Sequence, residues 1–154
     1  MTQSILRTGI MLRQMVIGQL QAMTETQIDF QSPGLSNTIR WNIGHMIYWF
    51  DKCSAVSFGI PSAIPAHYET LFGSGTKPSD WVIAPPAKDE LLQTLAAQLS
   101  QLSELSPDKL DTILTSPYQL GPFEFNTAGE LLNFALLHEA IHLGMISSQI
   151  KFIC

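Results

Sequence analysis

Two histidines, His138 and His142, stand four residues apart in a segment that is otherwise strongly apolar. The apolar residues around them recur at helical spacing without a proline, which predicts a helix. On a helix, residues four apart share one face about one turn from each other, so both imidazoles can reach a single ion. The same stripe, which is predicted to face the core, carries Leu131, Phe134, Ala135 and Met145. Buried imidazoles need polar partners, so the pair predicts a shared divalent cation or, alternatively, core histidines bonded to carbonyls or water.

A zinc-type site usually needs a third protein ligand, and the chain has two other histidines, His45 and His67. His45 lies in the stretch 36–50, whose length, Ser/Asn start and lack of proline predict a second long helix. The helix face that carries His45 also carries Trp41, Trp49 and Val56, so this face is predicted to point into the core. Three inward histidines on two helices, with a fourth position left to water or substrate, are typical of a catalytic metal site. His67 lies in a Pro/Gly-rich stretch and is predicted to be a solvated loop histidine.

The segment from His138 to His142 reads His-Glu-Ala-Ile-His and so matches the zinc-peptidase motif. In such peptidases a third ligand follows the motif, but no His, Asp or Glu follows His142 here. At most one short hairpin precedes the motif, in place of a substrate-aligning strand, so a peptidase is disfavoured. Glu139 lies about 100° from His138 and about 60° from His142 on the helical wheel. It either touches the metal site or, as we favour, is a solvated carboxylate at the helix edge.

Length and composition limit the possible classes of protein. A chain of 154 residues fits one domain, residues 1–154. With 45% hydrophobic and 14% charged residues it can form a full core, and a helix face used for a homodimer is expected. No apolar run reaches transmembrane length and no signal-peptide pattern opens the chain, so a cytoplasmic protein without membrane association is expected.

Charge and cysteine content add two further expectations. The net charge of −5 leaves no basic stripe for DNA or RNA, so nucleic-acid binding is disfavoured. Cys53 and Cys154 are isolated thiols without the spacing of a disulfide framework.

The periodicity predicts an all-α fold, a four-helix bundle. The first helix is expected over residues 4–27, and a short turn at 32–34 should make it an antiparallel neighbour of the His45 helix. Pro85 and Pro86 open the third helix, with Asp89 and Glu90 in its first turn. Its core stripe is predicted to comprise Leu92, Leu95, Leu99 and Leu102.

Two connections complete the predicted bundle. A long crossover, Ser57–Pro86, joins the second and third helices. Its aromatic residues either line the mouth of a pocket or, as we favour, pin the crossover onto the bundle. Residues 111–115 and 121–125 predict a small hairpin around a turn at Ser116-Pro117. Thr127 and Glu130 have capping-box spacing, so the histidine helix should begin there and run to about Lys151.

These residues resemble the DinB-like, or YfiT-like, metalloenzyme family. The matching stretches are Trp41-Asn42-Ile43-Gly44-His45, Phe72-Gly73-Ser74-Gly75, and residues 127–132 leading into His138-Glu139-Ala140-Ile141-His142-Leu143-Gly144. The resemblance implies a four-helix bundle, a three-histidine site for a divalent metal ion, zinc or nickel, and frequent homodimers. For activity, the resemblance implies a relation to thiol-dependent transferases and isomerases, which are enzymes that use low-molecular-weight thiols. The chain departs from the common His-Arg-Gly-Gln ending by reading His142-Leu143-Gly144-Met145.

Two functions remain open at this stage. The preferred one is a metal-dependent enzyme that acts on a small molecule by thiol transfer or hydrolysis, with His45, His138 and His142 as metal ligands. The ion would lower the pKa of a water or thiol at the open position. The alternative is a non-catalytic helical interaction or dimerisation module whose histidines are structural.

Overall fold

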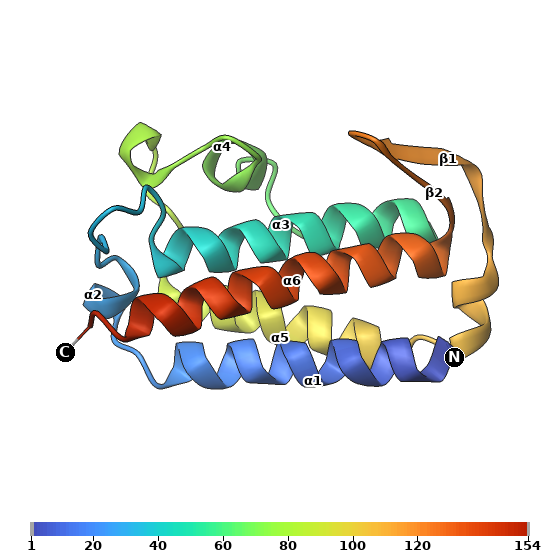
Figure 1. The fold of residues 1–154 in the computed structure, drawn as a ribbon, viewed down its shortest axis with the longest axis horizontal. Helices are drawn as coiled ribbons and strands as arrows, with labels where there is room; N and C mark the ends of the chain where they lie inside the picture. The colour runs from blue at the N-terminus through green and yellow to red at the C-terminus, as the bar shows by residue number, and fades with distance from the viewer. Residues whose placement is uncertain (1, 154) are drawn as a thin grey trace.

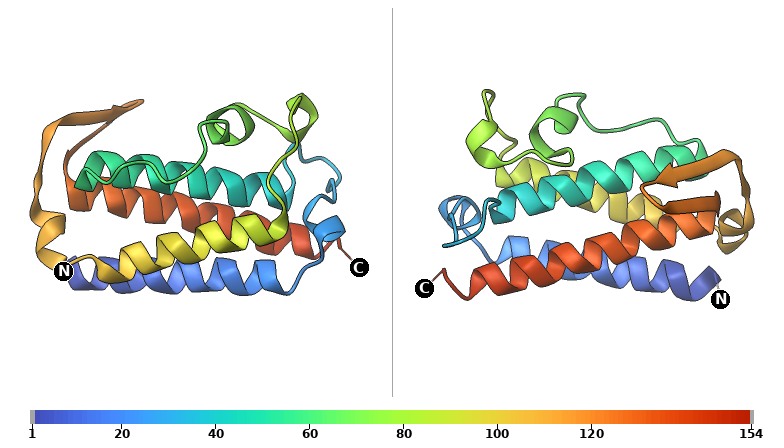
Figure 2. Two further views of the ribbon diagram at one scale, coloured as in Figure 1. Left: turned by 180° about the vertical axis from the view of Figure 1, so that it is seen from behind. Right: turned by 45° about the horizontal axis from the view of Figure 1, so that its top comes forward.

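The long helices of the chain lie side by side along the longest axis of the molecule (Figure 1). The computed structural model describes residues 2–153. The long helices are α1 (Thr2–Gln21), α3 (Ile39–Phe58), α5 (Lys88–Glu104) and α6 (Ala128–Ile150). α1 and α6 run in one direction and α3 and α5 in the other, as the views from both sides show (Figures 1 and 2). The prediction of a mostly helical chain is confirmed. No helix within residues 2–153 has both the length and the apolarity needed to cross a membrane.

The order of the helices differs from the prediction. α3 packs on α6 and α5, and α1 packs on the same two helices, so α1 and α3 lie on a diagonal. The predicted antiparallel contact between these two helices is therefore wrong. The reason is that α1 ends at Gln21, and Thr24 forms a capping box with Gln27 that starts a separate short helix, α2 (Glu25–Ile28). The connection is thus long enough to cross the diagonal.

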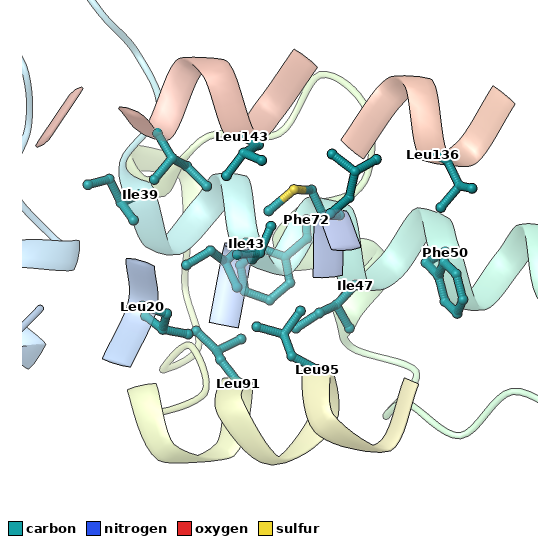
Figure 3. Packing of buried hydrophobic residues seen from close by; sticks show 14 of the residues in the cluster. Leu20, Ile39, Ile43, Ile47, Phe50, Phe72, Leu91, Leu95, Leu136 and Leu143 are labelled. Carbon is teal, nitrogen blue, oxygen red and sulfur yellow. The ribbon is translucent and has the colours of Figure 1, made fainter. Parts of the chain in front are cut away.

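The core fills the space between the four helices. Figure 3 shows Leu91 and Leu95 of α5 close to Ile43 and Ile47 of α3. The inner face of α5 differs in part from the predicted stripe, because Leu92 and Leu99 are only half-buried. Its buried residues are Leu91, Leu95, Gln98 and Leu102. The α5 stripe therefore includes one polar side chain, Gln98, which accepts a hydrogen bond from Arg13 of α1.

The crossover between α3 and α5 is held down by aromatic side chains. It contains a short helix, α4 (Tyr68–Phe72), and a 3-10 turn, η1 (Pro78–Asp80). The Phe72 ring is fully buried between Tyr68 and Trp81, with ring centroids 5.2 and 5.6 Å away. It lies against Gly44 of α3, where a Cβ atom would come within 2.4 Å of the ring. The missing side chain at Gly44 thus lets α4 sit directly on α3.

A two-stranded hairpin joins α5 to α6 after a short 3-10 helix, η2 (Pro107–Asp111). Its strands are β1 (Ile113–Leu120) and β2 (Phe123–Thr127), paired antiparallel. The predicted turn at Ser116-Pro117 is wrong, because both residues lie within β1 and the chain turns at Gly121, where φ is +56°. The predicted capping box is confirmed: the Thr127 hydroxyl accepts from the Glu130 amide and the Glu130 carboxylate accepts from the Thr127 amide.

Candidate metal centre

The packing of α3 against α6 brings His45, His138 and His142 together. His138 Nε2 lies 3.2 Å from His45 Nε2 and 3.1 Å from His142 Nε2. One ring nitrogen of each residue lies within 4.8 Å of the other two. Nitrogens bound to one tetrahedral zinc at roughly 2.0–2.1 Å would lie about 3.3 Å apart. The three side chains therefore have the spacing of ligands around a single ion.

The ring of His45 is fixed by the crossover. Its Nδ1 lies 2.6 Å from the Phe72 carbonyl oxygen, which can only accept, so Nδ1 carries the proton and donates it. The Trp41 ring stacks on the imidazole, with centroids 4.4 Å apart and an 18° interplanar angle. The Trp41 indole N–H donates in turn to the Thr76 hydroxyl at 2.9 Å. His45 Nε2 consequently keeps a free lone pair that points at the other two histidines.

The ring of His142 is fixed from within α3. Its Nδ1 lies 2.7 Å from Asn42 Oδ1. The Asn42 side-chain nitrogen donates to the Thr38 carbonyl at 2.9 Å and to Gln149 Oε1 at 3.1 Å, so the amide oxygen must be the atom that faces His142. His142 Nδ1 is thus the donor, and its Nε2 also presents a lone pair to the cluster.

The electrostatics of the cluster favour a cation. His138 Nε2 can donate a proton to at most one of its two neighbours, so at least one lone pair faces the centre without a donor. Burial lowers the pKa of His45 to about 4 and that of His142 to about 3, and it also lowers the pKa of His138. All three rings are therefore neutral near pH 7, as metal ligands must be. The donor set fits a divalent ion.

Aromatic rings border the cluster beside His138. His45 and His142 are buried, whereas His138 is half-buried. The centroid of the Trp49 ring lies 6.1 Å from that of the His138 ring, at a steep interplanar angle. The Phe134 ring also stacks on the His138 ring, with centroids 6.3 Å apart and an interplanar angle of 20°. The accessible side of the cluster is therefore the side of His138, where the Trp49 and Phe134 rings also lie.

Glu139 does not take part in the cluster. Its side chain is only 2% exposed, and Oε2 accepts from the guanidinium of Arg13 at 2.8 Å. Arg13 is fully buried, also donates to Gln98 Oε1 at 3.0 Å, and lies 4.5 Å from the Phe50 ring centroid. Both interpretations of Glu139, as a site residue and as a solvated carboxylate, are wrong, because Arg13 of α1 supplies a buried cation that pairs with it.

Exposure differs from the prediction at two further residues, Val56 and Met145. Val56 and Met145 were predicted on core faces, but they are 41% and 36% exposed. His67 is exposed at the start of α4, as predicted for a solvated histidine. Cys53 is buried and free, and Cys154 lies outside the described residues.

Sequence reasoning missed the groups that orient the histidines. Asn42 and Gln149 are almost fully buried, and both are polar residues on the inner faces of their helices. That pattern was the available signal, since a buried amide requires hydrogen-bonding partners. The Phe72 carbonyl left no signal, because every residue carries a backbone carbonyl.

Comparisons with known proteins identify the family of the chain. The family model of the DinB superfamily matches residues 11–146. The chain belongs to the DinB superfamily. A solved structure of a conserved protein from Enterococcus faecalis is similar over 97% of this chain and 94% of that chain, with a TM-score of 0.64 and 20% sequence identity. At that identity the likeness shows the fold alone. No curated protein matches the chain significantly.

Proposed function

We propose that this member of the DinB superfamily is a metal-dependent enzyme that acts on a small molecule, with His45, His138 and His142 holding one divalent ion, zinc or nickel. The observation that carries the proposal is the convergence of the three Nε2 atoms while two of the Nδ1 protons are already donated elsewhere. Only a cation satisfies all three lone pairs at once. We further infer that α1, α3, α5 and α6 form a four-helix bundle of the DinB type, with the crossover beside the site.

The residues of the chain have separate tasks in this proposal. A divalent ion supplies Lewis acidity, which lowers the pKa of a water or thiol that binds it. The Phe72 carbonyl and Asn42 hold the rings of His45 and His142 in the ligating tautomer. Trp41, stacked on His45, excludes water from the inner side of the site. An incoming molecule enters beside His138, between Trp49 and Phe134.

The reaction we propose is thiol transfer or hydrolysis, with a low-molecular-weight thiol as a possible cosubstrate. Leu143, which follows the second histidine of the pair, is buried in the core and offers no polar group to the site. Charge stabilisation at the reacting atoms must therefore come from the ion. The alternative, a non-catalytic helical module with structural histidines, predicts a protein that remains metal-free.

Removal of one ligand tests the metal site. Untagged wild-type protein should contain about one divalent ion per chain, and His45→Ala should lower the affinity for zinc or nickel by more than about 100-fold, because two imidazoles bind poorly. Elemental analysis and competition with a chromophoric chelator measure both quantities. His67→Ala, an exposed histidine far from the cluster in sequence, is the matched control and should keep the wild-type affinity. A wild-type protein that takes up neither zinc nor nickel would favour the module.

We also propose that the chain forms a homodimer through the outer face of α6. Leu137, Ile141 and Met145 form an exposed apolar stripe at four-residue spacing, and they are 60%, 57% and 36% exposed. Such a stripe on a soluble chain is typical of a contact between copies. Ile141→Lys should convert a dimer into a monomer in sedimentation equilibrium, whereas Ala96→Lys, at an exposed position of α5 away from the stripe, should not. A monomeric wild type at tens of micromolar contradicts this proposal.

A further inference from the structure

Lys52 lies on the same face of α3 as the metal centre. It follows His45 by seven residues, which on a helix corresponds to two turns and about 20° around the axis. Long side chains on a helix point back toward its N-terminus, which here is the direction of His45. The Lys52 Nζ accordingly lies 5.2 Å from the Trp49 ring centroid and 5.6 Å from that of Tyr48, one turn closer to the histidines. The Trp49 ring is the one that borders both His45 and His138.

This ammonium group has no carboxylate partner. Among the ion pairs within 4 Å that the described residues form, none involves Lys52, whose Nζ donates a hydrogen bond to the Tyr48 hydroxyl at 3.4 Å. The nearby Glu69 carboxylate accepts instead from that same hydroxyl, at 3.1 Å. The buried arginines, Arg13 and Arg40, are both paired with carboxylates. Lys52 is therefore a cation next to the site that is held by aromatic faces and remains able to bind an anion.

Two further observations fit an anionic ligand at this place. The Trp49 indole N–H is buried and has no acceptor among the described residues, so the wall beneath Lys52 offers a second donor. Burial lowers the pKa of Lys52, but Tyr48, Tyr118 and Glu69 outweigh it, so the pKa is raised above its ordinary value. The side chain is thus charged at neutral pH.

We propose that Lys52 binds the anionic group of the substrate, a carboxylate in the simplest case, and so selects small molecules that carry this group several ångströms from the atom that binds the ion. The inference rests on the proposed function, because the second anchor of such a molecule is the ion held by the three histidines. It names the class of substrate, an anionic small molecule with a metal-binding group at its other end. Lys52 is in this view a residue that determines specificity, and it does not act on the reacting atoms.

The test uses full-length protein loaded with Co(II) and two matched series of probes. The first series is the ω-mercaptoalkanoates with three to six carbons, and the second is the corresponding neutral mercaptoamides. Binding is followed by the visible absorption of Co(II) and by calorimetry, so no enzymatic activity is needed. For at least one chain length, we expect the carboxylate to bind about tenfold more tightly than its amide, as for a charge-assisted hydrogen bond that is partly exposed to solvent.

The variants assign this preference to one side chain. Lys52→Met keeps the apolar stem over Trp49, and it should reduce the ratio of carboxylate to amide affinity to about one while leaving the cobalt content and amide affinity unchanged. Lys52→Arg should retain the preference. Lys109→Met, which removes an exposed lysine in η2, is the matched control for net charge and should behave as the wild type.

The possible failures are distinguishable. Equal affinity for both series at every chain length in the cobalt-loaded wild type, or an unchanged preference in Lys52→Met, would overturn the role of Lys52 and leave the metal site intact. A wild type that takes up no cobalt would instead remove the proposed function, and this inference with it. Cobalt uptake without binding of either series would contradict the open coordination position on which both depend.

Discussion

Arg13→Met is expected to lower the free energy of unfolding by about 3–5 kcal/mol at pH 8, a large part of the roughly 5–15 kcal/mol of an ordinary domain. The substitution leaves the Glu139 carboxylate buried without its cation. It also removes the donor to Gln98 and the cation above the Phe50 ring. These partners come from α5, α6 and α3, so Arg13 of α1 connects all four long helices. Urea denaturation followed by circular dichroism measures the loss.

The destabilisation should depend on pH in a defined direction. Burial raises the pKa of Glu139 above its ordinary value even with Arg13 beside it, and the variant loses the counteracting charge. A carboxyl whose pKa is higher in the folded state than in the unfolded state makes its full favourable contribution to stability only at a pH below its unfolded pKa. Stability therefore falls as the pH rises through the folded pKa. Arg13→Met should accordingly lose less stability at pH 5 than at pH 8.

A double variant separates the loss of the ion pair from the loss of volume. Arg13→Met combined with Glu139→Leu removes both charges and keeps apolar bulk in the core, so it should recover most of the stability lost in the single variant. Lys109→Met, which removes an exposed positive charge, should change stability by less than about 0.5 kcal/mol. A loss below 1 kcal/mol in Arg13→Met, independent of pH, would contradict the assigned role of the pair.

The approach of the three histidines could be predicted because local rules determine most of it. The spacing of His138 and His142 places both on one face of any helix, and the tryptophans around His45 indicate its inward face. The packing of α3 against α6, which brings His45 to the other two histidines, is the part that no local rule predicts. The capping box at Thr127 was equally predictable, since its two hydrogen bonds join residues three apart.

The features that were missed depend on distant partners or on backbone geometry. Arg13 and Glu139 are 126 residues apart, and each looks like an ordinary surface charge on its own helix. The hairpin turn was placed at Ser116-Pro117, whereas the chain turns at Gly121, where the left-handed backbone favours glycine. The end of α1 was missed because apolar spacing continues past Gln21, whereas the Thr24 capping box starts a new helix.

Gly44→Ala is expected to weaken metal binding by about 10–100-fold without changing any ligand. The new methyl group would lie 2.4 Å from the Phe72 ring. Because Tyr68 and Trp81 enclose this ring, it cannot turn away, and the end of α4 must move. That movement takes the Phe72 carbonyl away from His45 Nδ1 and frees the imidazole to rotate or change tautomer. Chelator competition on the purified variant measures the affinity.

A second-site substitution tests whether the clash itself is the cause. Phe72→Leu removes most of the ring but keeps the backbone carbonyl, so Gly44→Ala with Phe72→Leu should bind metal more tightly than Gly44→Ala alone. Gly18→Ala is the matched control, because a Cβ at this position in α1 meets nothing within 4 Å and should leave metal affinity unchanged while stabilising the helix slightly. Wild-type metal affinity in Gly44→Ala would contradict the proposed coupling between the packing of the Phe72 ring on Gly44 and the orientation of His45.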